Sequence, residues 1–129
     1  MNDLSKLPDR ELDALFSTEV AGWTDIKGRH VGKGGTNFQG TLSGYPPRKG
    51  YVAPVSHFST SLDALMPWVE EVRKAGTRLE IWSIDNGWIF EIHDPHDWGT
   101  TQEVEAATLP RAVAEALILW KRAQKGAGL

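Results

Sequence analysis

Hydrophobic residues recur at helical spacing in three segments of the chain. The first helix is predicted over 9–21, the second over 61–75 and the third over 109–124, each with an apolar stripe on one face and turn or capping residues at its ends. Pro67 falls inside the second segment. Because an interior proline removes a helical hydrogen bond, we expect a kink or a restart of the helix there.

Alternating hydrophobic residues predict a β-hairpin. The runs 78–84 and 88–93 flank Asp85-Asn86-Gly87, and Asn-Gly is the favoured centre of a type I′ turn. A third short strand is predicted over 103–106. Both faces of the hairpin carry large apolar side chains, so we expect neither face to be left to water.

The resulting order is helix, long loop, helix, three strands, helix. It predicts an α+β fold in which a small antiparallel three-stranded sheet has helices on both faces, an α/β/α sandwich. The length of 129 residues suits one domain. Residues 22–56, between the first two helices, are expected to form a long glycine-rich loop.

Composition narrows the function classes. The chain has no Cys, which excludes disulfides and thiolate metal sites, and its formal charge of −3 argues against binding polymeric nucleic acid. The N-terminal segment lacks the pattern of a signal peptide, and no apolar run approaches the ~20 residues of a membrane span. We therefore expect a cytoplasmic protein without a membrane partner.

Three segments of the chain are similar to a known group of proteins: LPDRELDALFSTEVAGW (7–23), GYPPRKGYVAPVSHFSTSLDALMPWVEEV (44–72) and EAATLPRAVAEALILW (105–120). They resemble small tailed-phage proteins, the phage α/β/α (ABA) sandwich domain family. The resemblance implies an α/β/α sandwich and a phage or prophage origin, hence the cytoplasm of an infected bacterium. It supplies no established catalytic motif.

The stretch GRHVGKGGTNFQG (28–40) has the glycine content of a phosphate-binding loop. A Walker motif places four residues between its first Gly and Gly-Lys, and Ser or Thr after the Lys. Here three residues separate Gly28 from Gly32, and Gly34 follows Lys33. The stretch is therefore not a Walker loop.

The segment around this stretch is nevertheless strongly basic. Residues 23–54 contain five basic residues and one acidic residue, Asp25, which gives a net charge of +4. Since the whole chain has a net charge of −3, the remaining residues together carry −7. Clustered cations beside aromatic rings are typical of sites that hold nucleotides. A solvated surface insertion is the alternative. The candidate ligand-binding residues are Arg29, Lys33, Arg48, Lys49, Tyr45, Tyr51, Trp23 and His57.

Two histidine patterns contain residue types that metal sites and hydrolases use. His93, Asp94, His96 and Asp97 are metal-ligand types, but their spacing in a Pro-containing segment favours a turn, so no metal or other cofactor is predicted. The run from His57 to Thr60 is similar to half of the motif pair of two-histidine phosphoesterases. No second motif accompanies it, so no catalytic residue is predicted.

These observations predict a non-enzymatic phage protein that sequesters a small phosphate-bearing, nucleotide-derived ligand. Host antiviral signals such as cyclic nucleotides or ADP-ribose derivatives are the expected class, by analogy of fold and origin. A module that inhibits or recruits a host protein is the alternative, and a phosphodiesterase using His57 with His93 or His96 is a third. Exposed sheet edges also predict a homo-oligomer.

Overall fold

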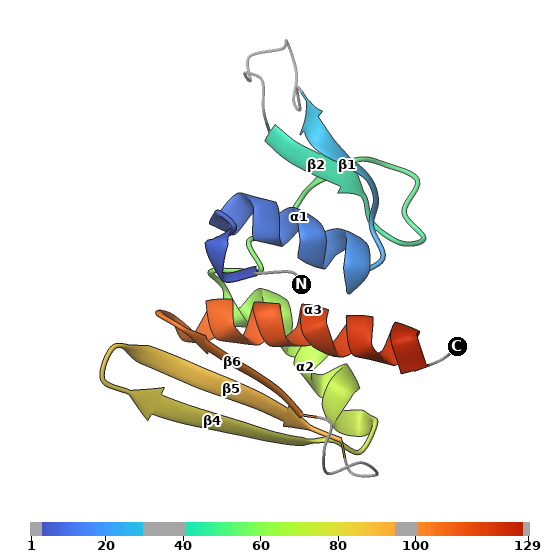
Figure 1. The fold of residues 1–129 in the computed structure, drawn as a ribbon. Helices are drawn as coiled ribbons and strands as arrows, with labels where there is room; N and C mark the ends of the chain where they lie inside the picture. The colour runs from blue at the N-terminus through green and yellow to red at the C-terminus, as the bar shows by residue number, and fades with distance from the viewer. Residues whose placement is uncertain (1–3, 30–40, 95–100, 128–129) are drawn as a thin grey trace.

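The computed structural model describes residues 4–29, 41–94 and 101–127 (Figure 1). It confirms an α+β fold with helices and antiparallel three-stranded sheets in a sandwich-like arrangement. The elements are η1 (Leu4–Lys6), α1 (Asp9–Glu19), β1 (Thr24–Arg29), β2 (Thr41–Tyr45), β3 (Ala53–Pro54), α2 (Leu62–Lys74), β4 (Arg78–Ile84), β5 (Gly87–His93), β6 (Thr101–Ala106) and α3 (Leu109–Ala127).

The helices begin and end close to the predicted positions, and a capping side chain defines the start of α2 and of α3. The Ser61 hydroxyl accepts a hydrogen bond from the Ala64 amide at 3.3 Å and caps α2. The expected restart of the helix at Pro67 is wrong, since α2 runs through that residue as one helix, whereas the kink stays a prediction. The carbonyl that loses its partner, four residues back, belongs to the exposed Asp63, where water can replace the missing amide.

The expectation of a loop over the whole of 22–56 is also wrong. The described parts of this segment contain a second antiparallel sheet in the order β1-β2-β3. Its strands are short, and the large apolar residues of β1 and β2 are Ile26, Leu42 and Tyr45, too few for the alternating pattern by which strands are recognised. Gly44 permits the pairing, because a Cβ there would clash with the Ile26 side chain and lie 2.9 Å from the Thr24 carbonyl oxygen.

The predicted sheet is present in the order β4-β5-β6, with a regular register in which Ile81 pairs with Phe90 and Phe90 with Val104. Phe90, Ile92 and Val104 are buried on the face that α3 covers. The helices lie between the two sheets rather than on both faces of this one (Figure 1). None of the helices in the described ranges covers the outward face, where Trp82 is exposed.

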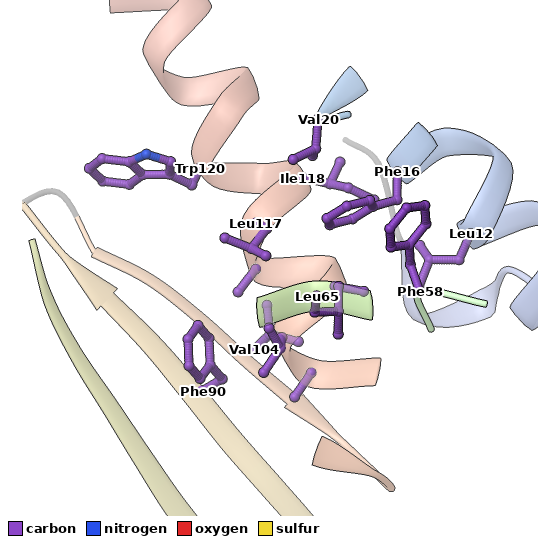
Figure 2. Packing of buried hydrophobic residues seen from close by; sticks show 14 of the residues in the cluster. Leu12, Phe16, Val20, Phe58, Leu65, Phe90, Val104, Leu117, Ile118 and Trp120 are labelled. Atoms are coloured by element: carbon purple, nitrogen blue, oxygen red, sulfur yellow. The ribbon is translucent and has the colours of Figure 1, made fainter. Parts of the chain in front are cut away.

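The core fills the space between α1, α2, α3 and the inner face of β4–β6, as Figure 2 shows. Phe16 of α1 stacks at 4.4 Å between ring centroids on Phe58, which precedes α2. Leu117 and Ile118 of α3 are buried beside them. In the part of the chain that the structure describes, no helix is both long and apolar enough to cross a bilayer.

Candidate functional site

A tight turn after β2 presents the basic residues that the sequence singled out. The Lys49 amide donates to the Pro46 carbonyl at 3.2 Å, and Arg48 has a φ of 63°. With Pro47 at the second position, this fits a type II turn, whose third position favours glycine. A non-glycine residue in this left-handed region costs on the order of 1–3 kcal/mol. Arg48 therefore occupies a position at which its backbone is strained.

The turn is packed against the end of the first helix. Gly22, which follows α1, has a φ of 78°, and a Cβ built on it would lie 3.3 Å from Cγ of Pro47. Two consecutive prolines also restrict the backbone leading into the turn. The turn is thus held on a rigid base, and its charged residues project from a defined place.

The side chains of this turn are open to solvent and combine charge with aromatic rings. We call residues 45–51 the basic turn. Lys49 places its Nζ 5.8 Å from the ring centroid of Tyr51, which is 56% exposed, and Tyr45 is 38% exposed. Among the residues that the structure describes, the exposed Arg48 side chain has neither an ion-pair nor a hydrogen-bond partner. The basic turn therefore offers a cation, Arg48, that no acidic residue of the described ranges neutralises.

The remaining candidates from the same segment are placed differently. Arg29 is the last residue of β1, paired with Thr41, and Lys33 lies outside the described residues. Trp23 is partly buried and packs against the core, and its amide donates to the Ser17 carbonyl at 2.8 Å. Its ring covers the core beside the end of α1, so it has less surface for stacking on a ligand than Tyr51.

His57 lies at the opposite end of α1 from the basic turn. Its Nδ1 is 3.2 Å from Nη1 of Arg10, in the first turn of α1. Arg10 also pairs with the buried Asp13 at 2.7 Å, and Asp13 accepts the Ser59 amide at 2.7 Å. Since α1 has 11 residues, its ends are about 16 Å apart. The structure therefore does not bring His57 to the basic turn.

A cavity of about 440 Å³ lies where β6 leads into α3, and sequence reasoning did not find it. Arg111 lines it, but its guanidinium already pairs with Glu115 at 2.7 Å and Asp9 at 2.8 Å and donates to two backbone carbonyls. Asp9, Glu105 and Glu115 make the lining acidic. The cavity therefore does not suit a phosphate-bearing ligand.

Sequence reasoning also missed the partners of His93. Its Nε2 lies 3.2 Å from Oε2 of Glu80 and 3.1 Å from Oε1 of Glu91, on the outward face of the β4–β6 sheet. The sequence-based interpretation had grouped His93 with His96 and Asp97, which lie outside the described residues. The hairpin centred on Asn86-Gly87 contains the signal, because its register places Glu80 opposite Glu91.

The comparisons with known proteins add no identity to these observations. No protein-family model, no curated protein and no solved structure matches the chain. The phage ABA sandwich resemblance therefore stays a prediction, and any functional conclusion has to come from the geometry described above.

Proposed function

We propose that this is a non-enzymatic, phage-encoded protein that captures a small phosphate-bearing, nucleotide-derived ligand at the basic turn. The observation that carries the proposal is Arg48, an exposed arginine in a left-handed conformation that glycine would adopt without strain. Backbone strain at an exposed charged residue is the kind of local cost found at ligand sites. A side chain retained at that cost is the most informative single feature of the turn.

The chemistry of the basic turn fits such a ligand. A guanidinium binds two phosphate oxygens at once, and a neighbouring ammonium adds a compact charge. The Tyr51 ring, already paired with the Lys49 ammonium, offers a flat face on which a base can stack. Cyclic nucleotides and ADP-ribose derivatives combine these two elements. Sequestration of such a signal requires affinity alone, without a nucleophile or a general base.

Calorimetric titration with a panel of cyclic dinucleotides, cyclic oligonucleotides, ADP-ribose derivatives and NAD tests the proposal. One compound should bind and be recovered chemically unchanged after the complex is heated. Arg48→Gly should weaken its binding at least tenfold while raising the free energy of unfolding by about 0.5–1 kcal/mol, because glycine relieves the strain. Loss of binding with a gain in stability cannot result from a damaged fold.

Lys74→Gln is the matched control, since Lys74 is an exposed cation in the last turn of α2, away from the basic turn. It should leave binding unchanged. If no compound of the panel binds, or if Arg48→Gly binds as tightly as the wild type, the basic turn is not the site. Steady loss of the bound compound would instead favour the phosphodiesterase alternative.

A second candidate, an interaction module for a host protein, is favoured by the exposed apolar residues of β4. Ile81 is 53% exposed and Trp82 is 51% exposed, on the strand at the edge of the sheet. An open edge with apolar side chains can pair with another chain, including a second copy of this one. Light scattering on the purified wild type and on purified Trp82→Ser separates self-association from binding to another protein. With no other protein in the sample, a mass above that of the monomer can come only from self-association.

A further inference from the structure

The outward face of the β4–β6 sheet gathers carboxylates in an unusual way. The register places Glu80, Glu91 and Glu103 side by side, one on each strand. Like charges directly opposite each other on neighbouring strands are destabilising. The next row holds Arg78, His93 and Thr101. A positive charge shared by the glutamates would remove their repulsion.

The atoms of this cluster are spaced as ligands of one cation would be. Glu80, Glu91 and His93 each offer one donor atom, and the three atoms lie within 4.8 Å of one another. The imidazole Nε2 is 3.2 Å and 3.1 Å from the two carboxylate oxygens. Donors around an ion with bonds of about 2.0–2.2 Å are themselves roughly 3.0–3.5 Å apart.

The ring nitrogen itself is the second observation. Nε2 of His93 is buried from solvent, and it makes no hydrogen bond even though two carboxylate oxygens are so close. Buried polar atoms are normally hydrogen-bonded, and Nε2 has only the two close carboxylate oxygens around it, so a cation between these three atoms would satisfy all of them. The other ring nitrogen, Nδ1, is 3.2 Å from the Thr101 hydroxyl. Metal-binding histidines are commonly oriented by a hydrogen bond of this kind, on the nitrogen that does not face the ion.

Arg78 competes for the same oxygen. Its Nε lies 3.0 Å from Oε2 of Glu80, but the arginine side chain is 59% exposed and belongs to the edge strand. A cation entering the cluster would displace this ion pair and release the arginine to solvent. Because Arg78 and a cation would compete for Glu80, removing the arginine charge should strengthen binding of the cation.

We propose that Glu80, Glu91 and His93 bind a divalent transition-metal ion of the Zn²⁺ class on the outward face of the β4–β6 sheet. One imidazole with two carboxylates suits such an ion, whereas Mg²⁺ and Ca²⁺ prefer oxygen ligands alone. Three protein ligands leave a position open to water. The site is independent of the basic turn.

Calorimetric titration of the untagged, metal-free protein with ZnCl₂ tests this site. We expect one ion per chain, bound at least 100-fold more tightly than Mg²⁺. Glu91→Gln and His93→Gln should each weaken Zn²⁺ at least 100-fold. Glu105→Gln, on the same face, and His57→Gln, elsewhere, should leave it unchanged. Absence of Zn²⁺ binding, or equal binding after His93→Gln, would overturn the proposal.

Two milder variants keep the test decisive if a ligand variant fails to fold. Arg78→Gln should tighten Zn²⁺ binding severalfold, because Glu80 is released. Thr101→Val should weaken it roughly tenfold, because the imidazole loses its orienting partner. If the cluster were only a structural ion network, Arg78→Gln and Thr101→Val would not change the affinity for Zn²⁺ in opposite directions. Changes in opposite directions support the metal site, and no change or a shared direction overturns it.

Discussion

The two sheets of this protein are built by the same antiparallel pairing but have little else in common. The β4–β6 sheet places Phe90 and Ile92 in the core, and over 78–94 and 101–106 it carries six carboxylates against Arg78 alone, a balance of −5. The β1–β3 sheet has Ser43 and Gly44 as its buried residues among those described, and the basic turn extends from it. Its stability rests on backbone pairing and close approach more than on apolar burial.

This difference has a functional meaning. Regions with few buried apolar contacts have low local stability, and binding regions are drawn from them. The sheet with the core residues therefore stabilises the molecule, while the other sheet positions exposed cations. Two experiments test this division of roles, and a third tests an ion pair between the helices that separate the sheets.

The largest effect is expected from the core face of β5. Phe90→Ala removes a ring that is 2% exposed, so it should lower the free energy of unfolding by about 3–5 kcal/mol in a urea titration. Tyr51→Ala, in the basic turn, should change it by less than about 0.5 kcal/mol. Comparable losses from both variants would mean that the two regions contribute equally to stability.

An intermediate effect is expected inside the second sheet. Gly44→Ala introduces a methyl group against the Ile26 side chain and the Thr24 carbonyl, and should destabilise the pairing of β1 with β2 by about 1–3 kcal/mol. Hydrogen exchange should then show weaker protection of the β2 amides, with the β5 amides unchanged. If β5 loses protection to the same extent, the two sheets unfold as one unit.

The smallest effect concerns the ion pair that joins α1 to α3. Arg122 donates to Glu19 at 2.6 and 2.7 Å. This hydrogen bonding, opposed by partial burial and assisted by the charge of Arg122, holds the pKa of Glu19 below its ordinary value of 4.5. A lowered carboxyl pKa contributes stability above that value, and the contribution is lost as the pH falls through the folded-state pKa.

We therefore expect Glu19→Gln to be about 1 kcal/mol less stable than the wild type at pH 7, since the pair is partly open to solvent. The difference should shrink in urea titrations below pH 4.5. A difference that persists at low pH would mean that packing, not charge, accounts for the contribution of Glu19.

The same contrast explains what could be predicted from the sequence. The predicted hairpin runs 78–84 and 88–93 match β4 and β5 to within a residue, because alternating apolar residues and Asn-Gly determine the strands and their register. The strands β1 and β2 escaped detection because Gly28 and Gly44 replace apolar residues in them. Strands that pair through the backbone without burying side chains show no alternation of apolar and polar residues in the sequence.

The candidate sites divide in a similar way. Arg48, Lys49 and Tyr51 are close in sequence, so their grouping on one turn could be anticipated from composition. The sequence places His57 next to the basic segment, yet the contact with Arg10 holds it at the other end of α1. The cluster around His93 depends on strand register, which links residues that are 11 and 13 positions apart.

The placement of the two sheets on opposite sides of the helices has one further consequence (Figure 1). Basic residues are in excess in the β1–β3 sheet and its basic turn, and carboxylates are in excess in the β4–β6 sheet. The molecule therefore has an electric dipole along the direction in which its layers stack. An approaching anion would meet the basic turn most favourably when this dipole points toward it. If the basic turn binds an anion as proposed, added salt should slow association, because it shortens the range of the field.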